Sequence, residues 1–206
     1  MTATSSAIAA IAFDLGNVLV ALDHLRFCRR LAPLAGMSPE AVYAAVFQTG
    51  LEPGYDTGRI SSEEFHRRVQ DHFRLDLPFP LFRQMWAEIF APLEDMEAVA
   101  ARLARRYPLY LLSNTNELHF RYIQENYAPL LSHFRALTLS YLVGSRKPEP
   151  QIFQALIREA GLPPAQILYT DDNPEFVEAA RAHGLVAWNF TSPREFQEQL
   201  SAAGLW

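Results

Sequence analysis

Five short apolar runs, separated by longer segments with helical periodicity, most constrain the fold of this chain. The runs are almost continuously apolar rather than alternating, and they span residues 8–13, 107–113, 136–140, 166–170 and 185–190. Such runs are typical of strands that are covered on both faces. Apolar residues recur three and four positions apart at 96–107, 116–127, 150–161, 173–184 and 193–204. This alternation predicts an α/β fold with a Rossmann-like, doubly wound parallel sheet.

The interval from 21 to 92 has a different pattern, with helical periodicity and no strand-like run. Four helices are expected, at roughly 23–34, 38–49, 61–74 and 79–90, with turn-rich joints at 53–59 and 76–80. Ser61 and Glu64 have the spacing of a capping box at the start of the third helix. We therefore expect a helical cap domain over residues 21–92, inserted after the first strand of a core domain formed by 1–20 and 93–206.

Composition narrows the classes of partner. The 206 residues carry a formal net charge of −5, which argues against nucleic acid as a partner. Cys28 is the only cysteine, so neither an internal disulfide nor a cysteine metal cluster can form. The first residues lack a basic region, and their apolar stretch reaches Asp14 too soon to span a membrane. We expect a soluble, cytoplasmic protein, either a monomer or a homodimer, without a membrane partner.

Polar residues follow four of the predicted strands. Ligands of doubly wound sheets bind beyond the carboxyl ends of the strands. Each polar residue taken alone is more often a turn or capping residue. Their occurrence together on successive strand ends predicts one shared site, formed by Asp14, Ser113 with Asn114, Arg146 with Lys147, and Asp171 with Asp172.

The segments that carry these residues resemble the motifs of a known family. "FDLGNVLV", "LLSNTN", "SRKPEP" and "LYTDDNPEF" are similar, in this order, to the four motifs of the haloacid dehalogenase-like (HAD) hydrolases. The helical segment after the first motif resembles the type 1 cap of that family. The residues of these motifs are similar to those of the sugar-phosphate phosphatase branch, typified by glucose-1-phosphate phosphatase. The resemblance implies a HAD-like core with a cap and a phosphatase activity.

The residue chemistry favours the same reaction. A carboxylate can attack phosphorus and divide hydrolysis into two easier displacements, so Asp14 is the candidate nucleophile. Because carboxylate and phosphate repel each other, a divalent cation is needed between them. Asp14, Asp172 and the backbone carbonyl of Gly16 are candidate ligands for Mg²⁺, which prefers oxygen donors. The resemblance implies that Asp172 binds the ion directly and that Asp171 orients a metal-bound water.

The remaining site residues are candidate phosphate-binding groups. Lys147 is expected to act in catalysis by neutralising the phosphoryl oxygens and by holding Asp14 and the acidic pair in place. The Ser113 hydroxyl and the backbone N–H groups of Leu15 and Asn114 are expected to donate hydrogen bonds to the transferring group.

Gly16 is a departure from the family pattern. Most HAD phosphatases carry at this position a second aspartate, which exchanges a proton with the leaving group and with water. Three hypotheses remain open. The protein is a Mg²⁺-dependent hydrolase of a small phosphorylated metabolite such as a sugar phosphate, with water or Asp171 handling the proton. Alternatively, it is a metal-free 2-haloacid dehalogenase, or a phosphate-binding protein with little catalysis. The acidic pair at 171–172 favours the first hypothesis.

Substrate selection is expected to rest on residues of the cap. Several polar side chains there could bind a polyol or a second anion: Asp23, His24, Glu52, Tyr55, Asp56 and Arg59. Phe47 and Trp86 are expected to belong to the hydrophobic core of the cap rather than to stack on a ligand. His119 is assigned no metal-binding role, because no carboxylate or cysteine lies at a suitable spacing.

Overall fold

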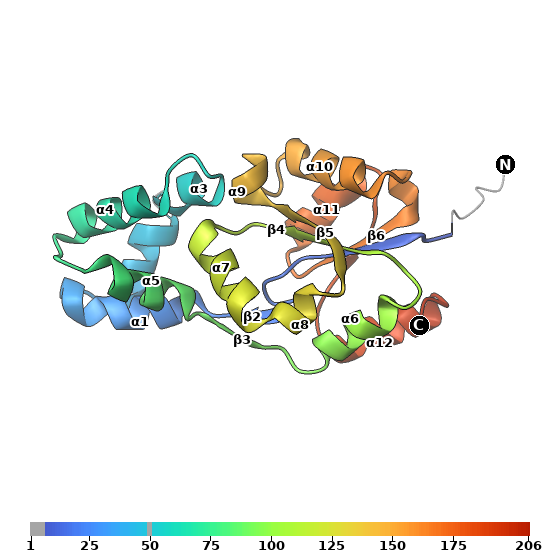
Figure 1. The fold of residues 1–206 in the computed structure, drawn as a ribbon, viewed down its shortest axis with the longest axis horizontal. Coiled ribbons are helices and arrows are strands. Elements are labelled where there is room, and N and C mark those ends of the chain that lie inside the picture. The colour runs from blue at the N-terminus through green and yellow to red at the C-terminus, as the bar shows by residue number, and fades with distance from the viewer. Residues whose placement is uncertain (1–6, 49–50) are drawn as a thin grey trace.

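A five-stranded parallel sheet forms the centre of the protein (Figure 1). The computed structural model describes residues 7–48 and 51–206. The strands are β1 (Ala10–Phe13), β4 (Leu109–Ser113), β5 (Phe134–Leu139), β6 (Ile167–Asp171) and β7 (Val186–Asn189). Their spatial order is β5-β4-β1-β6-β7, so β1 is central and its neighbours come from different parts of the chain. This arrangement confirms the doubly wound sheet that the five apolar runs predict.

Helices cover both faces of the sheet, which explains the continuous apolarity of the strands. On β1, Ala10 and Ala12 face α10 (Pro150–Ala160) and α11 (Pro174–Ala182). Ile11 and Phe13 face the opposite side, where α6 (Met96–Leu103), α7 (Glu117–Asn126) and α12 (Pro193–Ala202) contribute to the core. Two short helices, α8 (Ala128–Leu131) and α9 (Ser140–Val143), and a 3₁₀ turn at Pro164–Gln166 complete this part of the chain.

The cap helices gather at one end of the molecule (Figure 1). They are α1 (His24–Ala35), α2 (Pro39–Tyr43), α3 (Leu51–Asp56), α4 (Ser62–Phe73) and α5 (Phe79–Ala87), with a π-helical segment at Ala44–Gln48. The expected helix 38–49 is therefore divided, and its last residue lies outside the described residues. The joint expected at 53–59 was also wrong in part, because it contains the end of α3. Pro53 falls in the first turn of α3, where its missing N–H removes no helical hydrogen bond.

Two strands at the ends of the cap were missed in the sequence. Strands β2 (Val20–Leu22) and β3 (Phe90–Pro92) form an antiparallel ribbon, with Ala21 opposite Ala91. The expectation that no strand interrupts residues 21–92 was therefore wrong at both ends of that interval. Strands of three residues are too short to show a period of two in the sequence. The chain enters and leaves the cap through this one ribbon.

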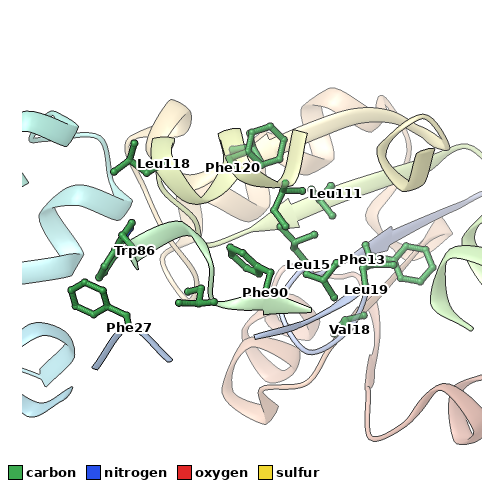
Figure 2. Close-up of a cluster of buried hydrophobic side chains, with 14 of the residues drawn as sticks. Phe13, Leu15, Val18, Leu19, Phe27, Trp86, Phe90, Leu111, Leu118 and Phe120 are labelled. Atoms are coloured by element: carbon green, nitrogen blue, oxygen red, sulfur yellow. The ribbon is translucent and has the colours of Figure 1, made fainter. Parts of the chain in front are cut away.

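The hydrophobic core continues from the sheet into the cap (Figure 2). Phe13 and Leu111 lie in the sheet, while Phe27 and Trp86 lie in the cap, and all four belong to one cluster of buried side chains. Trp86 is fully buried and stacks with Phe47, with a centroid distance of 5.7 Å. Trp86 therefore belongs to the core and Phe47 packs against it, as expected. Among the described residues, no helix is both long and apolar enough to cross a membrane.

Truncation of Trp86 is expected to destabilise the whole protein. Trp86→Ala should lower the free energy of unfolding by about 3–5 kcal/mol, because it leaves a cavity in a closely packed cluster. Urea unfolding followed by circular dichroism measures the change. Leu142→Ala is the control, since Leu142 is 69% exposed and should shift stability by less than about 0.5 kcal/mol. A loss below about 1 kcal/mol for Trp86→Ala would contradict this role.

Candidate active site

The carboxyl ends of the central strands bring the predicted site residues together. Asp14 directly follows β1, Ser113 ends β4, and Asp171 ends β6. Strands β4 and β6 flank β1 on its two sides, so these three residues lie at one edge of the sheet. The Asp14 backbone N–H donates to the Thr170 carbonyl at 2.9 Å, which extends the sheet pairing to the residue that bears the carboxylate. This edge is the switch point at which ligands of doubly wound sheets bind.

Lys147 joins the polar residues of two strands. Its Nζ donates to Asp14 Oδ1 at 2.7 Å, to Asp171 Oδ2 at 2.7 Å and to the Tyr169 hydroxyl at 3.0 Å. These three acceptors use all three N–H donors of the ammonium, whose side chain is 1% exposed. Burial opposes the charge, but Asp14 and Asp171 outweigh it and raise the pKa of Lys147 above its usual value. The lysine is therefore held as a buried cation.

The backbone of Lys147 is fixed by the asparagine after β4. Asn114 Oδ1 accepts a hydrogen bond from the Lys147 N–H at 2.7 Å, and Asn114 Nδ2 donates to the Lys147 carbonyl at 3.0 Å. This two-way pairing joins the loop after β4 to the loop that carries the lysine. The sequence pointed to the backbone N–H of Asn114, whereas its side chain has this additional positioning role.

Three carboxylates form a cluster suited to a cation. One oxygen from each of Asp14, Asp171 and Asp172 lies within 4.8 Å of the others. Burial raises the pKa of Asp14 to about 7, although Lys147 acts in the opposite direction. Burial and the neighbouring Asp171 also raise the pKa of Asp172. Three acidic groups share one ammonium, and this excess of hard oxygen donors fits a divalent cation such as Mg²⁺.

Two residues of this cluster were missed in the sequence. Tyr169 donates a short hydrogen bond to Asp171 Oδ2, yet in the sequence it is one more apolar residue of a strand. Its place two residues before Asp171, on the same face of β6, was the available signal. Asn17 donates to Asp172 Oδ2 at 3.4 Å and accepts from the Leu22 N–H at 3.0 Å. Its backbone φ of 55° is a conformation that asparagine adopts more readily than most residues.

A cavity of about 220 Å³ opens above this cluster. The core contributes the candidate site residues and Arg146 to its lining. They are Asp14, Leu15, Gly16, Ser113, Asn114, Arg146, Lys147 and Asp172. The cap and the ribbon contribute Leu22, His24, Glu52, Asp56 and Phe90. Asp171 is fully buried and does not line the cavity, so it acts on the cavity through Lys147.

Three of the six cap residues proposed for substrate selection do not line the cavity. Asp23 caps α1 by accepting a hydrogen bond from the Leu25 N–H at 2.9 Å. Tyr55 is buried, where its hydroxyl contacts Ser62 Oγ at 2.7 Å. Arg59 is exposed. His24, Glu52 and Asp56 line the cavity as expected.

Gly16 is enclosed by the ribbon. A Cβ added there would lie 3.0 Å from Leu22 Cδ2 and 3.6 Å from Leu22 Cβ. Gly16 is not among the residues with a positive φ, so the obstacle to a side chain is packing rather than backbone conformation. A side chain at this position would therefore press against a leucine of β2.

Comparison with known proteins assigns the family. A model of the haloacid dehalogenase-like hydrolase family matches residues 8–184. The chain belongs to this family. The predicted family, fold class and enzyme class, a hydrolase, are thus confirmed.

Two proteins similar to this HAD hydrolase come from Bacteroides thetaiotaomicron. D-ribitol-5-phosphate phosphatase is 25% identical over 198 residues, which cover 93% of this chain and 96% of the relative. A HAD family enzyme of the same organism has a TM-score of 0.86 at 23% identity, covering 94% of this chain and 98% of the other. A complex of that enzyme with magnesium and inorganic phosphate matches with a TM-score of 0.81 at 22% identity, covering 90% and 96% of the two chains.

Removal of the lysine charge is expected to destabilise the HAD core. Without added metal, Lys147→Met should cost about 3–5 kcal/mol, because it leaves buried carboxylates without their cation. Loss of the ammonium raises the pKa of Asp14 further, so the folded variant holds its proton to higher pH. Because the unfolded chain releases that proton near its ordinary pKa, the deficit should be larger at pH 8 than at pH 5. Urea unfolding in EDTA at both pH values measures it, and an equal or smaller deficit at pH 8 would contradict the charge argument.

The contact between Gly16 and Leu22 predicts a coupled pair of substitutions. Gly16→Ala should lower the free energy of unfolding by about 1 kcal/mol or more, because the added methyl overpacks the ribbon. In a Leu22→Ala background the same change should cost little, since the leucine side chain is gone. A double-mutant cycle measured by urea unfolding gives the interaction energy directly. Equal costs in both backgrounds would show that Leu22 does not restrict position 16.

Proposed function

We propose that the protein is a Mg²⁺-dependent phosphomonoester hydrolase of a small phosphorylated metabolite, namely a sugar or sugar-alcohol monophosphate. The observation that carries this proposal is the buried Asp14, held by Lys147 within a three-carboxylate cluster at the floor of a cavity. The related D-ribitol-5-phosphate phosphatase and the similar enzyme with bound magnesium and phosphate support it.

The donor set fits the proposed metal. Asp14, Asp172 and the carbonyl of Gly16 would hold Mg²⁺, as all three residues line the cavity. When bound, the ion neutralises charge between the carboxylates and the phosphate group. A metal-free dehalogenase has no need for this cluster of three carboxylates, which disfavours that alternative.

The chain's own residues account for the two displacements. Asp14 attacks phosphorus, the bond from phosphorus to the leaving oxygen breaks, and an aspartyl-phosphate forms. Water then attacks phosphorus, inorganic phosphate is released and the Asp14 carboxylate is restored. Lys147 keeps Asp14 oriented in both steps, through its contact at 2.7 Å. The Ser113 hydroxyl and the N–H groups of Leu15 and Asn114 donate to the phosphoryl oxygens.

Proton transfer is assigned to water rather than to a side chain at position 16. Asp171 is a poor candidate for this role, because its oxygens already accept from Lys147, Tyr169 and the Asn173 N–H. It also has no exposed surface at the cavity. We therefore assign Asp171 the role of positioning Lys147.

Loss of the nucleophile is expected to abolish phosphate release. Asp14→Asn should reduce hydrolysis of p-nitrophenyl phosphate and ribitol 5-phosphate to background, because an amide cannot attack phosphorus. EDTA should do the same for the unmodified protein, with recovery on addition of Mg²⁺. Colorimetric phosphate release measures both effects. Asp23→Asn makes the same chemical change outside the cavity and should retain activity.

Other outcomes would select another function. Chloride release from 2-chloropropionate in the presence of EDTA would establish the metal-free dehalogenase. If folded, Mg²⁺-loaded protein hydrolyses no phosphoester, the protein binds phosphate with little catalysis.

A further inference from the structure

Among the described residues, the cap side of the cavity offers no cation to a substrate. Among the described residues that line the cavity, the positive charges are those of Arg146 and Lys147, and both belong to the core domain. Lys147 is saturated by its three acceptors. Arg146 Nη1 lies 3.7 Å from Asp56 Oδ2 and so faces a carboxylate of the cap. A second anionic group on the substrate would therefore lie among the acidic groups Glu52 and Asp56, which disfavours its binding.

His24 has unused hydrogen-bonding capacity at this wall. Its Nδ1 is buried and has no hydrogen-bond partner among the described residues. Burial lowers the pKa of His24 to about 4, so the ring is neutral at physiological pH and presents both a donor and an acceptor. The ring packs on Phe47, at a centroid distance of 4.4 Å. A buried polar atom without a partner is unfavourable unless a ligand or water satisfies it.

The second cavity histidine provides a contrast. His119 Nε2 donates to the Trp86 carbonyl at 3.0 Å, and His119 Nδ1 accepts from Asn116 Nδ2 at 3.0 Å. Both ring nitrogens are thus used within the protein, and the tautomer is fixed. His119 holds the cap against the core, whereas His24 Nδ1 has no hydrogen-bond partner among the described residues.

Glu52 is the available carboxyl group of the cap wall. It is 9% exposed, lines the cavity, and makes no side-chain hydrogen bond to any described residue. Burial and the neighbouring Asp56 raise the pKa of Glu52 well above its usual range, while Arg146 acts in the opposite direction. Asp56, one helical turn later on α3, is already used: Asn116 Nδ2 donates to its Oδ1 at 3.0 Å.

We propose that His24 and Glu52 receive hydroxyl groups of the substrate and select an uncharged, polyhydroxylated monophosphate over substrates with a second anion. A neutral imidazole offers a donor and an acceptor, and a carboxyl group offers acceptors, so both are matched to hydroxyl groups, which donate and accept. A site built to hydrogen-bond hydroxyls disfavours ligands that leave its buried polar atoms unpaired. This inference rests on the proposed phosphatase function and assigns the specificity of the same cavity.

Steady-state kinetics with two substrates test the assignment. His24→Phe and Glu52→Leu should each reduce kcat/KM for ribitol 5-phosphate by about 10-fold to 100-fold. They should change kcat/KM for p-nitrophenyl phosphate, which has no hydroxyl chain, by less than about threefold. Glu52→Gln keeps an acceptor oxygen of similar position and should retain most of the activity on ribitol 5-phosphate. His72→Phe makes the same change as His24→Phe at an exposed cap position and should alter neither substrate.

The charge argument has its own test in the unmodified protein. Ribitol 5-phosphate should be preferred by at least about tenfold over 3-phosphoglycerate, whose organic part carries a carboxylate. A preference for 3-phosphoglycerate would overturn the inference, as would unchanged activity in the variants or equal losses on ribitol 5-phosphate and p-nitrophenyl phosphate. In each of those cases the phosphatase function would stand. Failure of the unmodified protein to hydrolyse any phosphoester would overturn the phosphatase function and this inference together.

Discussion

The ammonium of Lys147, shared between Asp14 and Asp171, is the interaction on which the site depends. It joins residues from the ends of two adjacent strands and balances part of the negative charge that they bury. Lys147 is the only lysine in the sequence, and the chain otherwise uses arginine for its permanent positive charges. A compact ammonium can direct three donors at three converging acceptors, whereas a planar guanidinium cannot. The geometry therefore explains why this position differs from the rest of the chain.

The loop after β4 connects this centre to the cap through two asparagines with separate roles. Asn114 holds the backbone of Lys147, as described above. Asn116 accepts from Trp86 Nε1 at 3.2 Å and donates to Asp56 and His119, so its amide is fully used between core and cap. A buried polar network that is completely satisfied favours one arrangement of its parts. One loop of three residues, 114–116, therefore sets both the position of Lys147 and that of the cap.

Much of the fold could be predicted because apolar runs and helical periods are local signals. The site was predictable where a polar residue follows an apolar run, as Asp14 and Asp171 do. Tyr169 was missed because its hydroxyl acts from within a strand that reads as apolar. In the cap, the sequence could not show that His24 and Glu52 line the cavity while Asp23 and Arg59 do not, because this depends on how the helices pack. The short ribbon has too few residues for any periodicity.

The closeness of Gly16 and Leu22 has a consequence for how this enzyme can change. The Cβ of an aspartate at position 16 would lie 3.0 Å from the end of the Leu22 side chain, and Leu22 is also the last residue of β2, whose N–H is bonded to Asn17. Gain of an acid therefore requires the leucine side chain to shift or to be replaced. In mutational terms the two positions are coupled, so a change at one alters which residues are tolerated at the other. The packing at the entrance to the cap thus contributes to which residue this enzyme can carry beside its nucleophile.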